Sequence, residues 1–140
     1  MNKQLQILLV EDDHLQTKDL RLALERELKA EVRALSTESA FRLELETIAA
    51  NPPDFAILDR MLRWANPARD MPSPPDDSRD PGEAGVRCGR ILRSDPRTEK
   101  VRILLYSVLG DEGDTGGFDC VVKETEFQNL IGRIRELTPA

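Results

Sequence analysis

The length, composition and charge of the chain exclude several classes of protein. With 140 residues, it can bury one hydrophobic core but not two domains of ordinary size. A net charge of −6 argues against sequence-independent binding of nucleic acid, which needs clustered Lys and Arg. There is no apolar run of membrane-spanning length and no signal-peptide pattern at the start, so we predict one cytoplasmic domain over residues 1–140.

The first third of the chain alternates between strand and helix patterns. Leu5 to Val10 is almost continuously apolar, which is typical of a strand covered on both faces, and it ends in Glu11-Asp12-Asp13. From about His14 to Lys29 an amphipathic helix is predicted, and Glu31 to Leu35 reads as a short strand. The helix pattern rests on leucines at near-helical spacing, namely Leu15, Leu20, Leu24 and Leu28.

A second helix and a buried strand follow. Ser36 or Thr37 can cap a helix that Pro52-Pro53 ends, with Phe41, Leu45, Ile48 and Ala49 on its apolar side. The run from Asp54 to Asp59 is apolar with an acid at each end, and its length predicts a buried strand. Asp59 would then stand at the carboxyl end of a central strand, where open α/β sheets bind their ligands.

The next segment loses all hydrophobic periodicity. Residues 63–81 hold five prolines among charged residues and form a predicted proline-rich loop insertion after the third strand. A helix resumes near Glu83 or Gly85 and ends at Ser94, before Asp95-Pro96.

The last third contains two strands and a helix. Val101 to Val108 and Phe118 to Val122 are strand patterns, separated by a glycine-rich segment that no stable helix would accept. The final helix is expected to begin with a capping box at Thr125 to Gln128. Cys88 and Cys120 lie far apart in sequence, each in a predicted regular element, so reduced thiols are expected.

This alternation predicts a parallel sheet between two layers of helices. In such a sheet Glu11, Asp12, Asp59, Ser107 and Lys123 would meet at the carboxyl edge, although they are scattered in sequence. The clustered carboxylates repel one another unless a pKa rises or a cation binds, and Mg²⁺ suits such ligands. A carboxylate can also accept a phosphoryl group as a nucleophile, with a metal, a lysine and a hydroxyl neutralising the charge.

Four motifs in this order resemble the receiver domain of two-component response regulators, including the stand-alone chemotaxis type. The motifs are Ile7-Leu8-Leu9-Val10-Glu11-Asp12-Asp13, Ala56-Ile57-Leu58-Asp59-Arg60-Met61, Leu104-Leu105-Tyr106-Ser107 and Val121-Val122-Lys123. The resemblance covers essentially the whole chain. It implies a doubly wound, flavodoxin-like sheet of five parallel strands in the order 2-1-3-4-5.

The resemblance also implies a role for each site residue. Asp59 would be the phosphoacceptor, with Ser107 bonding the phosphoryl group and Lys123 pairing with it. Asp12 would bind Mg²⁺ directly, Glu11 through water, and the backbone carbonyl of Met61 would complete the shell. The donor would be a histidine kinase or phosphotransfer protein, and the chain would be a signalling module rather than an enzyme.

Several positions depart from the family pattern. Glu124 replaces the usual proline after the lysine, and Cys120 replaces the aromatic switch residue three positions before it. The insertion lengthens the loop beside Asp59, and the segment between Ser107 and Lys123 is short, so the fourth helix is expected to be reduced or missing. No output domain is expected after the last helix.

Two alternatives stay open. The chain could be a receiver-fold adaptor that binds a protein partner independently of phosphorylation, through the insertion or the altered output face. It could instead be a metal-dependent phosphohydrolase or small-molecule binder, although no further catalytic base is evident and His14 is a poor candidate.

Overall fold

The computed structural model describes residues 4–65 and 83–138 and shows a five-stranded, all-parallel sheet. The strands are β1 (Gln6–Val10), β2 (Glu31–Leu35), β3 (Phe55–Leu58), β4 (Arg102–Ser107) and β5 (Asp119–Val122). The helices are α1 (His14–Leu28), α2 (Glu38–Leu43), α3 (Leu45–Ala50), α4 (Ala84–Ser94) and α5 (Gln128–Leu137). The strand order is β2-β1-β3-β4-β5, which confirms the predicted topology.

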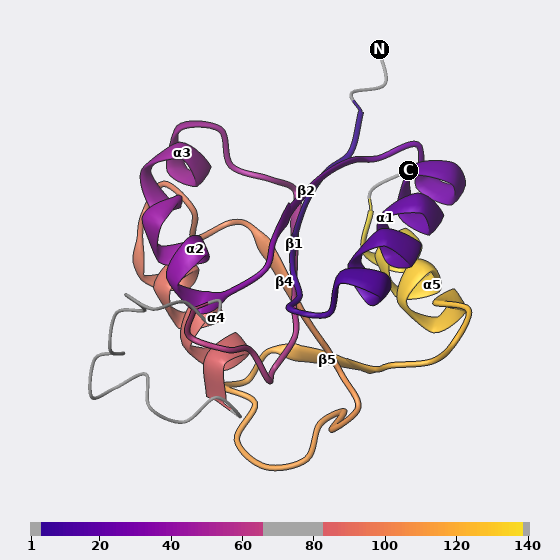
Figure 1. The fold of residues 1–140 in the computed structure, drawn as a ribbon. Coiled ribbons are helices and arrows are strands. Elements are labelled where there is room, and N and C mark those ends of the chain that lie inside the picture. Colours follow the sequence, from indigo (N-terminus) through magenta and orange to yellow (C-terminus); the bar gives the residue numbers. More distant parts are fainter. Residues whose placement is uncertain (1–3, 66–82, 139–140) are drawn as a thin grey trace.

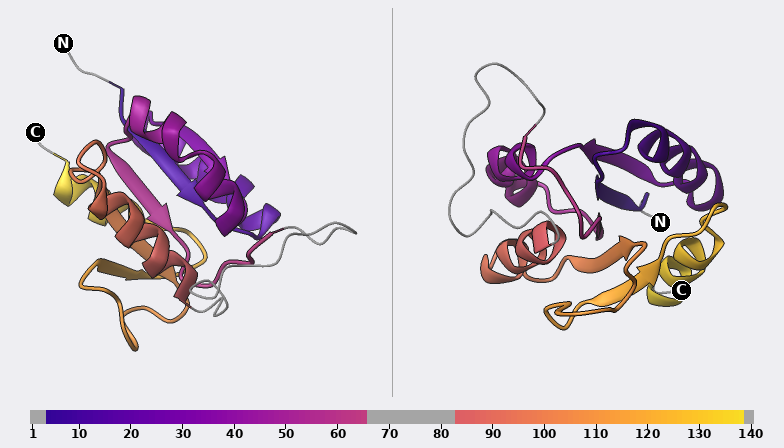
Figure 2. Two further views of the ribbon diagram at one scale, coloured as in Figure 1. Left: turned by 90° about the vertical axis from the view of Figure 1, so that its left-hand side faces the viewer. Right: turned by 60° about the horizontal axis from the view of Figure 1, so that its bottom comes forward.

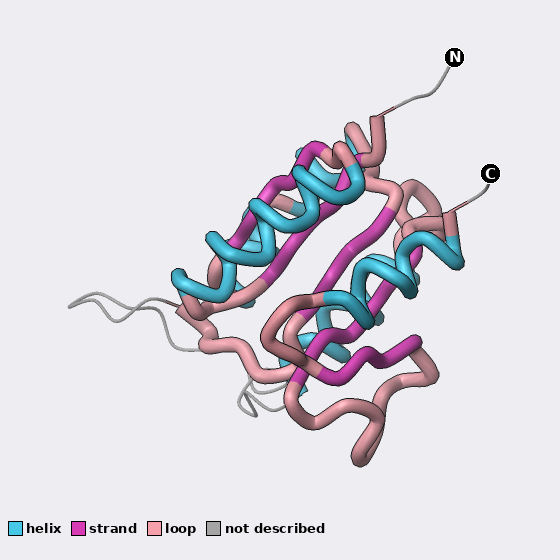
Figure 3. Tube along the Cα trace, turned by 90° about the vertical axis from the view of Figure 1, so that its right-hand side faces the viewer, coloured by secondary structure: helices cyan, strands magenta, loops and turns pink. Residues whose placement is uncertain are grey.

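Two layers of helices cover the two faces of this sheet. α1 and α5 lie on one face, and α2, α3 and α4 lie on the other (Figures 1 and 2). Figure 3 looks onto the first of these layers, with α1 and α5 lying over the sheet. Among the described residues, no helix is both long and apolar enough to cross a membrane.

The central strands are apolar throughout because both of their faces are covered. Successive residues of β1 enter different cores: Ile7 and Leu9 pack with α1 and α5, whereas Leu8 and Val10 pack with α2 and α4. All four residues of β3 are buried. Because both faces of β1 and β3 are covered, the charged residues Glu11 and Asp59 lie beyond the carboxyl ends of these strands.

Three local expectations were wrong. The capping box at Thr125 does not form: α5 begins at Gln128, after Phe127 in a left-handed conformation, and the carboxylate of Glu124 accepts the Asn129 amide at 2.6 Å instead. The single helix expected after Thr37 is divided at Glu44 into α2 and α3. Leu15, which the leucine spacing placed on the apolar side of the predicted helix, is 69% exposed.

The glycine-rich segment between β4 and β5 forms turns and contains no helix. The family's fourth helix, which would connect these two strands, is therefore missing, and α4 of this chain is the helix between β3 and β4. Gly110, Gly113, Gly116 and Gly117 all have positive φ, which side-chain-bearing residues adopt with strain. Of the predicted insertion at 63–81, only residues 63–65 are among those described, and its other residues, 66–81, lie outside them.

Candidate functional site

An acidic cluster lies where β1 and β3 end. Glu11 and Asp12 follow β1 and Asp59 follows β3, and one carboxylate oxygen from each lies within 4.8 Å of the others. Glu11 and Asp59 are buried, and Asp12 is partly exposed. Parallel pairing of Val10 with Leu58 places the two strand ends side by side, which explains the convergence. The cluster therefore opens to solvent on the side of Asp12.

Lys123 bridges two members of the cluster. Its ammonium lies 2.5 Å from Glu11 Oε1 and 2.7 Å from Asp59 Oδ2. Lys123 follows β5, and its backbone amide donates to the carbonyl of Ser107 at 3.0 Å, which holds the lysine at the sheet edge. The other oxygen of Asp59 accepts the Met61 amide at 3.1 Å.

The environment shifts the pKa values of Glu11 and Lys123. Burial raises the pKa of the Glu11 carboxyl from 4.5 to about 7, and the adjacent Asp59 adds to the shift while Lys123 opposes it. Burial would lower the pKa of Lys123, but its hydrogen bonds to Asp59 and Glu11 outweigh that effect and raise it. Lys123 is therefore charged at neutral pH, and Glu11 is poised to accept or release a proton there.

Ser107 and Met61 lie next to the cluster without side-chain hydrogen bonds to it. Ser107 ends β4 and is 1% exposed, and its hydroxyl accepts the Leu109 amide at 3.2 Å. Met61 is two residues beyond Asp59, and its side chain is exposed. The structure thus brings Glu11, Asp12, Asp59 and Lys123 into one cluster and leaves Ser107 and Met61 at its margin.

Sequence reasoning missed two arginines beside the cluster. Arg60 is 3% exposed and donates to the carbonyls of Gly110 and Asp114, at 3.1 and 3.4 Å, in the segment that replaces the fourth helix. Arg63 donates its backbone amide to Asp12 Oδ2 at 3.1 Å. A second charged residue after the apolar β3 run, next to Asp59, was the only signal for Arg60, and Arg63 fell within the predicted loop.

Gly85 packs α4 directly against the backbone of Asp59. A Cβ atom at Gly85 would lie 2.3 Å from the carbonyl oxygen of Asp59, and the Gly85 amide donates to the carbonyl of Arg60 at 3.2 Å. Only a residue without a side chain fits here. The backbone of Asp59 is therefore fixed by α4 as well as by the sheet.

One departure from the family pattern, Glu124 in place of proline, has a local explanation. The backbone amide of Glu124 donates to the Tyr106 hydroxyl at 3.3 Å, a bond that proline could not make. Cys120 is partly buried and Cys88 is buried, and both thiols are free.

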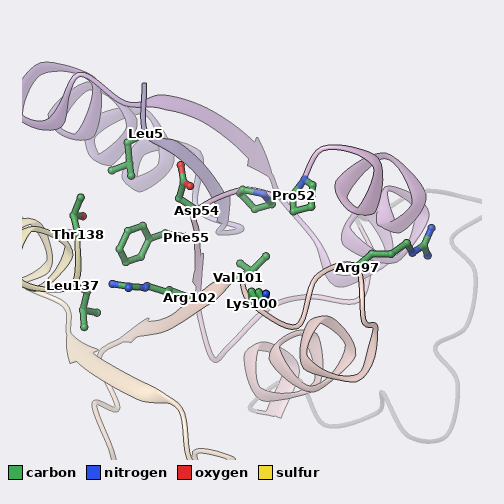
Figure 4. A pocket seen from close by; sticks show the side chains of 11 residues that line it. Leu5, Pro52, Asp54, Phe55, Arg97, Lys100, Val101, Arg102, Leu137 and Thr138 are labelled. Atoms are coloured by element: carbon green, nitrogen blue, oxygen red, sulfur yellow. The ribbon is translucent and has the colours of Figure 1, made fainter. Parts of the chain in front are cut away.

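A cavity of about 560 Å³ lies at the opposite, amino-terminal edge of the sheet (Figure 4). Its lining includes Phe55, Arg102 and Leu137, and none of the predicted site residues. The residues predicted from the sequence to carry chemistry therefore lie away from this cavity.

Comparisons with known proteins agree with this fold. No family model matches the sequence. The phosphate regulon transcriptional regulatory protein PhoB of Rhizobium meliloti (strain 1021) is 28% identical over 138 residues, which are 94% of this chain and 51% of PhoB. The chain thus spans about half the length of this curated relative.

Solved structures give the same result. A candidate response regulator from Chloroflexus aurantiacus J-10-fl is 25% identical with a TM-score of 0.67, covering 96% of this chain and 97% of that one. The receiver domain of a sensor histidine kinase from Pseudomonas aeruginosa PAO1, which has magnesium in its active-site cleft, is 18% identical with a TM-score of 0.63, covering 94% and 97%. The chain has the receiver-domain fold, and the resemblance drawn from its motifs is confirmed.

Proposed function

We propose that the chain is a phosphoacceptor signalling domain that takes a phosphoryl group on Asp59 in a Mg²⁺-dependent reaction. The observation that carries the proposal is the contact of one lysine, Lys123, with both Glu11 and Asp59 inside a cluster of three carboxylates. The donor is a histidine kinase or phosphotransfer protein. We also propose that the chain forms a single domain in the cytoplasm, as its sequence predicts.

The residues present fit a magnesium ion. Three carboxylates with oxygens within 4.8 Å of one another supply the hard ligands that Mg²⁺ prefers. Glu11, Asp12, Asp59 and the backbone carbonyl of Met61 would hold the ion. When bound, it would neutralise charge on the transferring phosphoryl group.

The chain's own groups then assist the transfer. A carboxylate oxygen of Asp59 forms the new P–O bond while the P–N bond of the donor phosphohistidine breaks, and the imidazole keeps the electron pair and takes up a proton. The Lys123 ammonium, already 2.7 Å from Asp59, offsets the charge that develops. Ser107 would donate its hydroxyl proton to the phosphoryl group, since its oxygen only accepts the Leu109 amide and leaves that proton free. The added negative charge then changes the binding of a downstream partner.

Intact-protein mass spectrometry tests the proposal. Incubation with acetyl phosphate and Mg²⁺ should add the mass of one phosphoryl group to the wild type. EDTA or the substitution Asp59→Asn should abolish this addition. An unlabelled wild type, under conditions that label a control receiver, would refute the function, and labelling that survives Asp59→Asn would refute the site.

The missing fourth helix favours one alternative, a receiver-fold adaptor that acts without phosphorylation. Residues 108–118 present turns where the family's output helix would lie. If the chain is such an adaptor, its capture of a partner should be unchanged by Asp59→Asn and lost on deletion of residues 63–81. The phosphoacceptor proposal predicts partner capture that responds to labelling of Asp59.

A further inference from the structure

Each carboxylate of the acidic cluster has a cationic partner. Lys123 contacts Glu11 and Asp59, whereas Asp12 is contacted by Arg63, whose Nε lies 3.6 Å from Asp12 Oδ2. The backbone amide of Arg63 donates to the same oxygen at 3.1 Å. The cluster is therefore compensated by two side chains of the protein, one at the buried side and one at the open side.

The backbone around Arg63 is held independently of its guanidinium. The carbonyl of Arg63 accepts the Glu38 amide at 3.0 Å, and the carbonyl of Trp64 accepts the Ser39 amide at 2.8 Å, so this segment docks on the first turn of α2. The side chain of Arg63, in contrast, is 53% exposed. The guanidinium can therefore leave Asp12 for solvent while the backbone stays in place.

We infer that Arg63 competes with the divalent cation for Asp12 and so lowers the affinity of the metal site. This inference rests on the proposed function, because it takes Asp12 to be a metal ligand. A cation that binds Asp12 must either displace the guanidinium from Oδ2 or lie beside its positive charge on the same carboxylate, and both arrangements cost free energy. The free energy of that ion pair is thus subtracted from the free energy of metal binding.

The dissociation constant for Mg²⁺ of Arg63→Met tests the inference. This variant removes the guanidinium and keeps the backbone amide. Because an exposed ion pair of this kind is weak, its loss should tighten Mg²⁺ binding by about two- to fivefold at low ionic strength. The gain should shrink at high salt, which screens exposed charges. Isothermal titration calorimetry gives the constant, and fluorescence of Trp64, the single tryptophan, reports binding next to Arg63.

Arg26→Met is the matched control. It removes the same charge from an exposed ion pair with Glu27 in the last turn of α1, at the other end of that helix from the cluster. Its Mg²⁺ affinity should equal that of the wild type. Arg63→Lys keeps the charge and loses the planar group, so its affinity should fall between those of the wild type and Arg63→Met.

The outcomes separate the two claims. Binding by Arg63→Met that is equal to or weaker than that of Arg26→Met would refute the role of Arg63 and leave the metal site standing. An absence of Mg²⁺ binding by the wild type and every variant would refute the metal site itself. Urea unfolding of each variant verifies that the compared proteins are folded.

Discussion

At the residue scale, Lys123 determines how the buried charges of the site are balanced. It lies within 2.7 Å of Asp59 and 2.5 Å of Glu11, and it is the only cationic side chain in ion-pair contact with either of them among the described residues. Its position follows from β5, whose pairing with β4 places residue 123 beyond Ser107. One side chain thus links strands that are far apart in sequence.

We expect Lys123→Met to slow the phosphorylation of Asp59 by acetyl phosphate by about 10- to 100-fold, because a preorganised cation is lost from the developing charge. The measurement is a time course of intact mass at fixed Mg²⁺. Lys100→Met, which removes an exposed lysine outside the cluster, should label at the wild-type rate. Equal rates for the two variants would contradict the role given to Lys123.

At the scale of the elements, α4 approaches the site more closely than a side chain would allow. We expect Gly85→Ala to lower the free energy of unfolding by about 2–4 kcal/mol, because its Cβ would lie 2.3 Å from a backbone carbonyl that cannot move aside. Urea denaturation measures this change, provided that the dependence of the free energy of unfolding on urea concentration is the same in both proteins.

Gly132→Ala is the matched control for this substitution. Gly132 lies inside α5, and a Cβ there meets no atom within 4 Å. Alanine should therefore raise the free energy of unfolding by about 0.5–1 kcal/mol, through helix propensity alone. If both substitutions changed the free energy of unfolding in the same direction, the close approach of α4 to Asp59 would not be a constraint on the fold.

Arg60 holds the segment that replaces the fourth helix. Arg60→Met should lower the free energy of unfolding by about 1–3 kcal/mol, because the carbonyl of Gly110 loses its donor in a buried setting and the partly buried carbonyl of Asp114 loses a weaker one. Amide hydrogen exchange should become faster over residues 108–118. Arg90→Met removes an exposed ion pair to Asp114 on the same segment and should change the free energy of unfolding by less than about 1 kcal/mol. Unchanged amide exchange in Arg60→Met would show that the glycine-rich turns are stable without the contacts of Arg60.

At the scale of the whole molecule, the raised pKa of Glu11 makes stability depend on pH. A folded-state pKa of about 7 against an ordinary value of 4.5 means that the folded protein binds this proton more tightly than the unfolded chain. Between these two values the contribution of Glu11 to the free energy of unfolding therefore falls as pH rises. Lys123 does not add to this pH dependence, because its pKa is raised and it stays charged between pH 4.5 and 7.

Glu11→Gln isolates the effect. In EDTA, the wild type should lose stability relative to Glu11→Gln as the pH rises from 4.5 to 7. Urea unfolding at several pH values measures the difference. Added Mg²⁺ should reduce the loss at pH 7, since the ion stabilises the folded state that binds it. A difference that is constant across this range would contradict the raised pKa.

The sequence alone determined the alternation of elements and the ends of the buried strands. Continuous apolar runs such as that of β3 need cover on both faces, so the parallel sheet and the meeting of Glu11, Asp12, Asp59 and Lys123 could be predicted. Glycines at four of eight positions, 110–117, were enough to exclude the fourth helix.

Only the tertiary structure decided how the site is held. The contacts of Arg60 with Gly110 and Arg63 with Asp12 join residues about 50 positions apart, and no local pattern encodes which loop lies beside which strand end. The start of α5 was missed for a similar reason. The burial of Phe127 in the core and the Glu124 carboxylate outweighed the capping preference of Thr125, because packing and hydrogen bonding in the folded chain exceed a local propensity.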